Sequence, residues 1–344
     1  MRALVKTAKG AGHVALATDW PSPRPEPGWV VIDVIACGIC GTDLHIVDDE
    51  HRNWPPVVLG HEYVGRIAEI GAGVTGWAVG DRVVCEQHTL ACGRCDVCRR
   101  GAIHLCPHKR SPGWGINGAF ADQVALPVHL LHRVPDGVAD LAAVLTEPSA
   151  ICLTGLDRLD LRAGERVAVI GPGPIGLVSA LLARRAGAAE VFVLGRSSSA
   201  ERLDLARHLG FPTVTTDRED AVAAVKAATG RLGVDAVVES SGAGEALTHA
   251  IRISRSLGRI ACLGIGGHGP SLVALDEAMS KSLSVHFSMS SEYSTWDRAL
   301  RLMSAGYDPE PLTKVYPLED WAAAFADVAA RRVVKAVIMP GRSG

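Results

Sequence analysis

The sequence predicts an α/β protein with two parts, a β-rich domain and a domain built on a doubly wound parallel sheet. Its 344 residues suffice for about two domains of ordinary size. Roughly the first 131 residues contain short β-rich runs interrupted by Gly and Pro, whereas strand and helix signals alternate from about residue 147 to residue 289. We therefore expect a β-rich domain at 1–150 and a parallel-sheet domain at 151–290, followed by a C-terminal segment at 291–344.

Further elements are expected on both sides of the middle of the chain. The strands expected in the first segment are 29–36, 63–70, 82–85 and 121–126. After residue 290 the expected elements are a helix at 296–304, a proline-containing loop at 308–311, a helix at 318–330 and a last strand at 333–338. These last elements either finish the parallel sheet or return to the first domain.

The middle of the chain contains alternating strands and helices. The expected strands are 166–170, 190–194, 236–239, 259–263 and 284–287, with helices at 174–186 and 200–209. Strands and helices that alternate at this spacing form right-handed crossovers on a parallel sheet. A doubly wound domain is therefore expected.

Charge and hydropathy argue against several classes of protein. The chain has 35 Lys plus Arg against 37 Asp plus Glu, a net charge of −2, so it lacks the basic excess of a nucleic-acid-binding or cationic membrane-surface protein. Its N-terminus has no apolar core of signal-peptide length, and no run approaches about 18 apolar residues. We expect a soluble cytoplasmic protein that has neither nucleic acid nor membrane as a partner.

A glycine-rich turn lies between the first strand and the first helix of the middle domain. Gly171, Gly173 and Gly176 form G-x-G-x-x-G, with Pro174 and Ile175 inside the motif. In a dinucleotide-binding fold these glycines permit a tight turn, a close approach to the pyrophosphate, and close packing of helix on strand, while the helix N-terminus binds the anion. Glycines in any βα turn can mimic the motif, but the flanking strand and helix favour a coenzyme site.

The end of the second strand bears on which coenzyme binds. NAD-binding sequences have an acidic residue there for the ribose 2′-hydroxyl, whereas this chain has Gly195, Arg196 and Ser197. A glycine leaves room for a 2′-phosphate. An arginine supplies a charged guanidinium group with paired N–H donors, and a serine adds a hydroxyl hydrogen-bond donor. These residues predict a preference for NADP. The alternative is that Arg196 is a solvated loop residue and that NAD is used.

Four of the nine cysteines lie in one short segment at 88–108. Cys92, Cys95, Cys98 and Cys106 have C-x2-C-x2-C-x7-C spacing, which lets a loop surround a zinc ion and fill all four tetrahedral positions. Such a closed site is structural. An iron–sulfur cluster can use similar spacing, and unliganded surface thiols are a further alternative. A nucleic-acid-binding zinc finger would need a recognition helix and a basic domain, which the flanking sequence lacks.

A second group of metal-ligand residues is dispersed along the sequence. Cys40 follows a predicted strand, His61 and Glu62 precede another, and Glu147 opens the helix that leads into the middle domain. A catalytic zinc needs three protein ligands and an open position, for which thiolate, imidazole and carboxylate are suitable donors. Taken singly, Cys40 could be a small buried residue, His61 a core histidine, and Glu147 an acid at a helix N-terminus.

Together and in this order, the motifs resemble those of the zinc-dependent medium-chain dehydrogenase/reductase superfamily, in particular its sorbitol and threonine dehydrogenase-like branch. The resemblance covers nearly the whole chain. It rests on Gly-Ile-Cys-Gly-Thr-Asp at 38–43, Gly-His-Glu at 60–62, Val-Gly-Asp-Arg-Val at 79–83, the four-cysteine segment, Glu-Pro at 147–148, and the glycine-rich turn. It implies a GroES-like catalytic domain at 1–150 and 291–344, a Rossmann domain at 151–290, and two zinc ions per chain.

The resemblance also implies a role for each residue of the dispersed group. Cys40, His61 and either Glu62 or Glu147 would hold the catalytic zinc, because carboxylate ligation varies among members of the family. Asp43 would accept a hydrogen bond from the zinc-bound histidine and so fix its tautomer.

Further roles follow from the same resemblance. Thr42 and His45 match a relay that passes the substrate proton to solvent, and Glu62 and Glu147 count among the catalytic residues. The residues expected beside the coenzyme or the substrate also include Leu263, Gly264, Trp54 and Trp114. The two tryptophans could equally be ordinary core or loop residues. The branch usually has Asp at the end of the second strand; Gly195-Arg196 instead resembles its NADP-using ketose and polyol reductases.

The expected activity is the reversible oxidation of a secondary alcohol, namely a polyol, sugar or amino alcohol, by hydride transfer to nicotinamide, with NADP preferred. The alternatives are an NAD-dependent simple alcohol or L-threonine dehydrogenase, a zinc-free quinone reductase-like relative, and an NADP-binding redox sensor without turnover. Both sets of metal ligands argue against the zinc-free relative. Members of the family pair through a strand, here around 284–289, so a homo-oligomer, either a dimer or a homotetramer, is expected.

Overall fold

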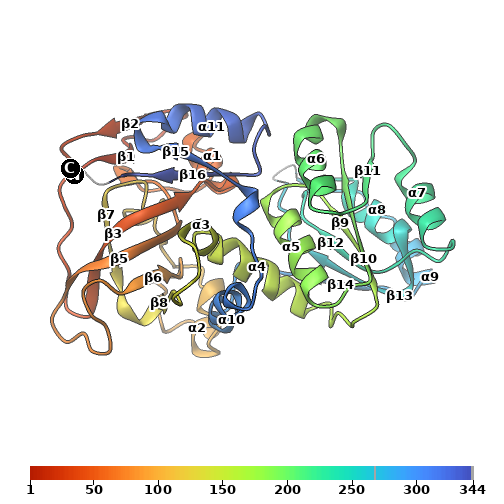
Figure 1. Cartoon of the computed structure of the whole chain (residues 1–344), viewed down its shortest axis with the longest axis horizontal. Coiled ribbons are helices and arrows are strands. Elements are labelled where there is room, and N and C mark those ends of the chain that lie inside the picture. The colour runs from red at the N-terminus through yellow and green to blue at the C-terminus, as the bar shows by residue number, and fades with distance from the viewer. Residues whose placement is uncertain (267–268, 342–344) are drawn as a thin grey trace. The chain divides into compact units, whose positions relative to one another are not determined.

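The computed structural model describes residues 1–266 and 269–341, and the chain divides into two compact units (Figure 1). The first unit contains 1–147, 292–330 and the described residues from 335 onward. The second unit contains 148–291 and 331–334. Each unit has its own sheets, so the two are described in turn.

The first unit contains two sheets. The smaller has the strand order β2-β1-β4, and the larger has the order β15-β16-β3-β5-β6-β8, with β7 paired to β3. The bounds are β1 Ala3–Lys6, β2 Val14–Ala17, β3 Trp29–Gly38, β4 Val57–Val58, β5 Glu62–Ile70, β6 Arg82–Cys85, β7 Gln123–Pro127, β8 Leu131–Arg133, β15 Thr313–Pro317 and β16 Lys335–Met339. Strand β3 is long because its apolar run, with Val30 and Ile32 fully buried, continues beyond the predicted end. It pairs antiparallel with β5, and Gly38 lies opposite Glu62.

The C-terminal elements return to the first unit. Strand β16 pairs antiparallel with β3, with Val337 opposite Gly38, and β15 runs parallel to β16. The helix expected at 318–330 begins as a 3-10 turn and only then becomes α11. The helices of this unit are α1 Gly41–Val47, α2 Asp96–Arg99, α3 Asp140–Ala143, α10 Tyr293–Ser304 and α11 Trp321–Ala329, with 3-10 turns at Ile103–Leu105, Val128–Leu130, Glu310–Leu312 and Leu318–Asp320.

A buried lysine anchors the short helix α1. The ammonium group of Lys6 donates hydrogen bonds to the carbonyl oxygens of Gly10 (2.5 Å), Gly12 (2.6 Å) and Val47 (3.0 Å). Val47 is the last residue of α1, where helix carbonyls lack partners within the helix and a positive charge is favourable. Lys6 therefore satisfies the end of the helix that carries Thr42, Asp43 and His45.

The second unit is a parallel sheet of six strands in the order β11-β10-β9-β12-β13-β14. The sequence predicts a parallel sheet and five of these strands, but not β11. Its strands are β9 Arg166–Ile170, β10 Glu190–Gly195, β11 Thr213–Thr215, β12 Val234–Glu239, β13 Ser254–Cys262 and β14 Ser284–Phe287. Its helices are α4 Thr146–Asp157, which begins at the end of the first unit, α5 Pro174–Arg185, α6 Ala200–His208, α7 Ala221–Ala228, α8 Ala246–Ile253 and α9 Leu275–Ser280, with a 3-10 turn at Ser197–Ser199.

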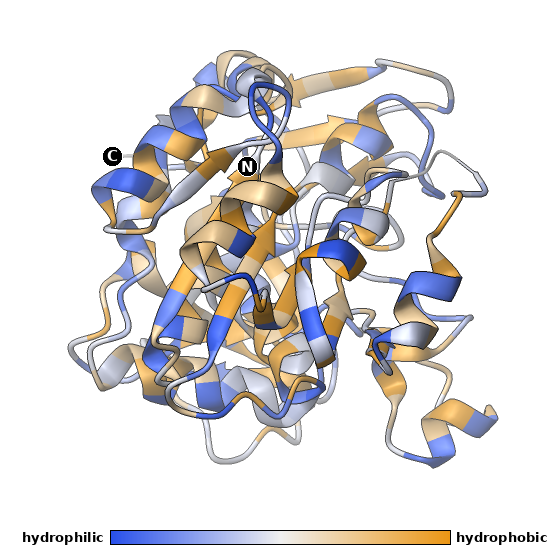
Figure 2. Cartoon of the chain, turned by 90° about the vertical axis from the view of Figure 1, so that its right-hand side faces the viewer, coloured by the Kyte–Doolittle hydropathy of each residue, from blue (hydrophilic) through white to orange (hydrophobic). Residues whose placement is uncertain are grey.

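The core of the second unit lies between its strands and helices. Ala168 and Ile170 of β9 join a buried cluster with residues of α7, α8 and α9, while α5 and α6 pack on β9, β10 and β11. Several helices carry both hydrophobic and hydrophilic residues, as expected for helices that have one face on a sheet and the other in solvent (Figure 2). Among the helices of the described residues, none is both long enough and apolar enough to cross a bilayer.

Candidate functional site

Cys40, His61 and Glu62 come together where β3 ends and β5 begins. The pairing of Gly38 with Glu62 brings Cys40, two residues after the end of β3, beside the first residues of β5. One ligand atom from each of the three residues lies within 4.8 Å of the others, and His61 and Glu62 are buried. A sulfur, a nitrogen and an oxygen donor in one small group suit a zinc ion that keeps an open position. The residues present therefore fit a catalytic zinc.

Asp43 supports this group from α1. Its Oδ2 accepts a hydrogen bond from the backbone N–H of Cys40 (2.9 Å), and its Oδ1 lies 3.4 Å from Nδ1 of His61. Oδ1 of Asp43 and Nδ1 of His61 are both buried, and neither has a well-aligned hydrogen bond. Burial lowers the pKa of His61, but Asp43 and Cys40 more than offset this, so the pKa is raised well above its usual value. The arrangement matches a carboxylate that orients a ligating histidine.

Lys335 is a site residue that the sequence motifs do not reveal. Its ammonium group donates to Oε2 of Glu62 (2.5 Å) and to the carbonyl oxygen of Ile39 (3.0 Å), and both charged side chains are buried. A Cβ at Gly38 would lie 2.5 Å from the same carboxylate oxygen, so a larger residue there would displace the Glu62 side chain. The single signal in the sequence is a lysine within an otherwise apolar strand.

Glu147 is buried close to this group but is held by another partner. Its Oε1 accepts a hydrogen bond from Nε2 of Gln87. Burial, followed by the charge of Glu62, raises the pKa of Glu147 to about 8. Glu62, rather than Glu147, shares the compact group with Cys40 and His61.

The predicted relay residues lie on α1. Oγ1 of Thr42 is 3.6 Å from Sγ of Cys40, and His45 is half exposed, with its Nδ1 2.7 Å from Oε2 of Glu50. Thr42 thus lies beside the metal ligands and His45 faces solvent.

The two tryptophans predicted on the substrate side contact each other. The rings of Trp54 and Trp114 stack with centroids 5.7 Å apart, the guanidinium of Arg52 lies 4.7 Å from the Trp114 ring, and that of Arg110 lies 4.6 Å from the Trp54 ring. Trp114 is buried, whereas Trp54 is 38% exposed. Trp54 is therefore the tryptophan available to a ligand.

The four clustered cysteines form a second candidate metal site. Their sulfur atoms all lie within 4.8 Å of one another, and all four cysteines are free thiols. Short helical turns fold the segment back, so that the backbone N–H of Cys92 lies 3.4 Å from Sγ of Cys106. Backbone N–H groups of Arg94 and Cys95 lower the pKa of Cys92 to about 6, which favours a thiolate. Four sulfur donors in this geometry fit a closed zinc site.

The remaining cysteines are buried. Cys37, Cys85 and Cys262 lie on strands and Cys152 lies on α4.

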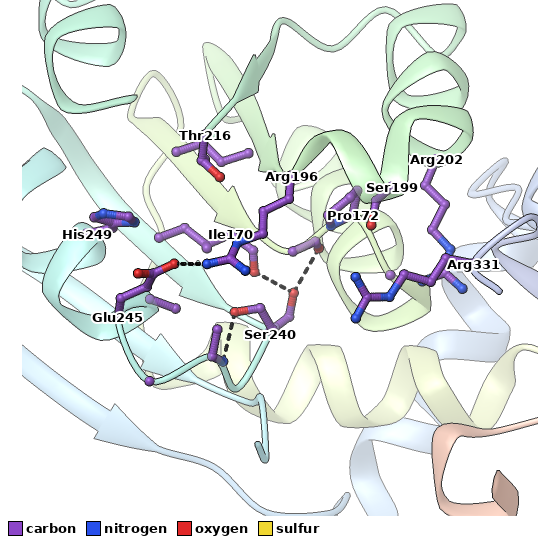
Figure 3. A pocket seen from close by; sticks show the side chains of 18 of the residues that line it. Ile170, Pro172, Arg196, Ser199, Arg202, Thr216, Ser240, Glu245, His249 and Arg331 are labelled. Atoms are coloured by element: carbon purple, nitrogen blue, oxygen red, sulfur yellow. Dashed lines mark hydrogen bonds and ion pairs between the residues drawn. The ribbon is translucent and has the colours of Figure 1, made fainter. Parts of the chain in front are cut away.

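The glycine-rich turn opens onto a cavity of about 720 Å³ in the second unit (Figure 3). Gly171 follows β9 with φ 102°, and a Cβ there would lie 3.0 Å from Ser241. A Cβ on Gly176 would collide with the carbonyl oxygen of Gly171, so helix and strand approach as closely as the motif requires. Gly173 precedes α5 and Pro174 is its first residue, a position where proline is well tolerated. This cavity fits the phosphates of a dinucleotide at the N-terminus of α5.

Three arginines surround the same cavity. Arg196 forms an ion pair with Glu245, Arg331 donates to Oγ of Ser198 (3.0 Å), and Arg202 donates from Nε to the carbonyl oxygen of Val333 (2.9 Å). Burial, followed by the charge of Arg331, lowers the pKa of Arg202 to about 10. Sequence motifs identify only Arg196, because the other two come from α6 and from the short segment 331–334.

Other predicted coenzyme residues lie at or near this cavity. Ser197 donates from its backbone N–H (2.7 Å) and from its hydroxyl (2.5 Å) to Asp217. Gly195 lines the 720 Å³ cavity. Leu263 and Gly264 follow β13 and line a second cavity of about 500 Å³. The carbonyl oxygen of Ile175 accepts a hydrogen bond from Sγ of Cys152 (3.2 Å).

Comparisons with known families match both units. The alcohol dehydrogenase GroES-like domain matches residues 26–136, and the zinc-binding dehydrogenase family matches residues 174–305. The chain is 34% identical to a sorbitol dehydrogenase of Halalkalibacterium halodurans, covering 99% of both chains. It is 38% identical to an L-threonine 3-dehydrogenase of Streptomyces avermitilis, covering 98% of this chain and 99% of the relative. It is 33% identical to a D-arabitol-phosphate dehydrogenase of Enterococcus avium, covering 98% and 97%.

Solved structures agree with these families. A protein from Sinorhizobium meliloti 1021, assigned as a zinc-binding dehydrogenase and bound to NADP, superimposes with a TM-score of 0.90 at 30% identity, over 98% of this chain and 99% of that one. The 2R,3R-butanediol dehydrogenase of Bacillus subtilis gives a TM-score of 0.88 at 28% identity, over 99% of both chains.

Proposed function

The chain belongs to the zinc-containing medium-chain alcohol dehydrogenase superfamily, and on that premise we propose that it oxidises a secondary alcohol of the polyol, sugar or amino-alcohol class with NADP as the preferred coenzyme. It is a zinc-dependent oxidoreductase that acts on CH–OH donors. The substrate class, the coenzyme preference and the individual residue roles below are the proposal.

We assign Cys40, His61 and Glu62 to the catalytic zinc, and Cys92, Cys95, Cys98 and Cys106 to the structural zinc. When bound, zinc supplies a Lewis acid that lowers the pKa of an alcohol, and NADP supplies the hydride acceptor. Asp43 keeps the His61 ring oriented, and Lys335 holds one oxygen of Glu62, leaving the other for the metal. Thr42 and His45 would carry the hydroxyl proton outward to solvent.

The polarity around the metal ligands supports a hydroxylated or amino-substituted substrate. Besides Glu62, a second carboxyl group, Glu147, is buried close by. A carboxyl group accepts hydrogen bonds, and donates one when it is protonated, which suits a second hydroxyl or an amino group of a substrate better than a simple alkyl chain. The relatives that act on sorbitol, D-arabitol phosphate and L-threonine are consistent with this class.

The observation that carries the choice of NADP is the charge of the coenzyme cavity. Arg196, Arg202 and Arg331 all line it, and Gly195 stands at the strand end where an NAD-binding sequence has an acid. Guanidinium groups bind phosphates through paired, charge-assisted hydrogen bonds. The NADP-bound relative from Sinorhizobium meliloti supports the same choice.

A substrate screen with both coenzymes tests the proposal directly. Polyols, sugars, amino alcohols and simple secondary alcohols would be incubated with zinc-loaded protein and either NADP or NAD, and the absorbance of the reduced nicotinamide followed. We expect turnover of a hydroxylated or amino-substituted alcohol, with a higher kcat/KM for NADP. Turnover confined to simple alcohols would contradict the proposed substrate class, and a preference for NAD would contradict the proposed coenzyme preference. Coenzyme binding without any turnover would favour the redox-sensor alternative.

Replacing Arg196 with alanine should weaken NADP binding about tenfold or more, because a charge-assisted contact to a phosphate contributes about 1.5–3 kcal/mol. NAD lacks the 2′-phosphate, so its affinity should change little. The dissociation constants of both coenzymes, measured by titration of the purified protein, provide the check. Equal losses for the two coenzymes would contradict a role for Arg196 at the 2′-phosphate.

We also propose that two copies of the chain pair through β14. This strand forms one edge of the parallel sheet. Its last residue, Phe287, is 77% exposed, and Met289, two residues later, is 58% exposed. An edge strand with exposed apolar residues favours pairing with another chain. Phe287→Glu should therefore shift the protein toward monomer in light scattering after size-exclusion chromatography. The control is Leu232→Glu, at an exposed leucine elsewhere in the same unit, and it should not change the oligomeric state. Dissociation by both variants, or by neither, would argue against this interface.

A further inference from the structure

An ion pair spans the coenzyme cavity between residues that are far apart in the sequence. Arg196 follows β10 directly, and Glu245 immediately precedes α8. The guanidinium of Arg196 reaches across the cavity to the carboxylate of Glu245 (Figure 3). Their side chains are 58% and 54% exposed, so the pair is accessible to solvent and costs little to open.

Glu245 is the one carboxylate among the described residues that line this cavity. The two other arginines of the lining donate to uncharged oxygens, Arg202 to the carbonyl of Val333 and Arg331 to the hydroxyl of Ser198. Arg196 therefore differs from them in having an acidic partner. A phosphate that binds Arg196 must displace that partner or share the guanidinium with it.

We propose that Glu245 is a specificity-determining residue, whose carboxylate competes with the 2′-phosphate of NADP for Arg196 and favours NAD. This inference rests on the proposed coenzyme function of the cavity. Two negative groups around one guanidinium repel each other, so Glu245 weakens NADP binding. With NAD there is no 2′-phosphate, so the ion pair persists, and the carboxylate offers an acceptor for the ribose 2′-hydroxyl.

The position of Glu245 explains how this role arises. In NAD-binding sheets the acid that accepts from the ribose hydroxyl lies at the end of the second strand, here β10. In this chain that position is Gly195, and the acid of the cavity comes instead from the loop before α8. One cavity thus contains both an arginine suited to NADP and a carboxylate suited to NAD, and their mutual pairing sets the balance.

The test is the variant Glu245→Gln, which keeps the shape of the side chain and removes its charge. Titration of the purified zinc-loaded protein should show NADP binding about three- to tenfold tighter, with no tightening for NAD, the scale expected for one exposed charge. The gain should shrink at high ionic strength, because salt screens exposed charges. Glu277→Gln is the matched control, since Glu277 pairs with Arg252 at 2.9 Å with similar exposure but outside this cavity, and it should leave both affinities unchanged.

A double variant shows whether Glu245 acts through Arg196. If it does, Glu245→Gln should tighten NADP binding less in an Arg196→Gln background than in the native protein. Glu245→Gln could leave the ratio of NADP to NAD affinity unchanged while Arg196→Ala still weakens NADP binding more than NAD binding. This result would overturn the role of Glu245 and leave the NADP assignment intact. A native protein that binds only NAD would refute the NADP preference, and a Glu245→Gln variant that still bound no NADP would then refute the role of Glu245 as well.

Discussion

Replacing Lys335 with methionine is expected to destabilise the metal-free protein by about 3–5 kcal/mol, because it leaves the carboxylate of Glu62 buried without its partner. The two side chains are 1% and 2% exposed, and the ammonium also binds the carbonyl oxygen of Ile39. Desolvated charges that lose their partner are among the most destabilising changes in a protein core. Denaturant unfolding, followed by a probe in the first unit such as its tryptophan fluorescence, gives the measurement.

Three comparisons separate this effect from a general loss of packing. Lys314→Met breaks an exposed pair with Asp327 and should cost less than about 1 kcal/mol. Adding Glu62→Gln to Lys335→Met removes the unpaired charge and should restore much of the stability. Zinc should also restore part of it, since a bound cation again faces Glu62. A Lys335→Met protein as stable as Lys314→Met would show that the buried pair does not have this role.

Replacing Cys40 with alanine should lower turnover by about three orders of magnitude or more, because several kcal/mol of transition-state stabilisation depend on the metal that it would bind. We expect the zinc content to fall from about two ions per chain to about one, since Cys92, Cys95, Cys98 and Cys106 retain their own site. Coenzyme binding in the second unit should persist. Elemental analysis, steady-state kinetics and coenzyme titration together provide the check.

Cys37→Ala is the matched control for this variant. Cys37 lies three residues before Cys40 on β3 and is fully buried, but it is not part of the group of ligand atoms. It should retain two zinc ions and most of the turnover. Full turnover in Cys40→Ala, or an equal loss in both variants, would contradict the assignment of Cys40.

Features that depend on local spacing could be predicted from the sequence. The glycine-rich turn and the four-cysteine segment are examples, because the residues that act together lie within one turn or one loop. The parallel sheet was also predicted, since each of its longer strands is an apolar run. Strand β11, only Thr213–Thr215, was missed because three residues give no clear alternation.

Contacts between distant segments could not be predicted in the same way. Lys335 and Glu62 are separated by 273 residues, and their contact depends on β16 returning to pair with β3. Glu245 and Arg196 meet only because the loops after β10 and β12 open on the same end of a parallel sheet. Motifs identify one member of each pair, and the fold supplies the other.

The two buried lysines have a practical consequence for following the folded state by chemical labelling. Amine-reactive reagents need an accessible, unprotonated amine, whereas Lys6 and Lys335 are almost fully buried and engaged by carbonyl or carboxylate oxygens. Lys314, with 57% of its side chain exposed, can be acylated in the folded protein. Labelling at Lys6 therefore reports opening around α1, and labelling at Lys335 reports separation of β16 from the metal ligands. The chain thus contains two natural reporters of local unfolding, one at α1 and one at β16.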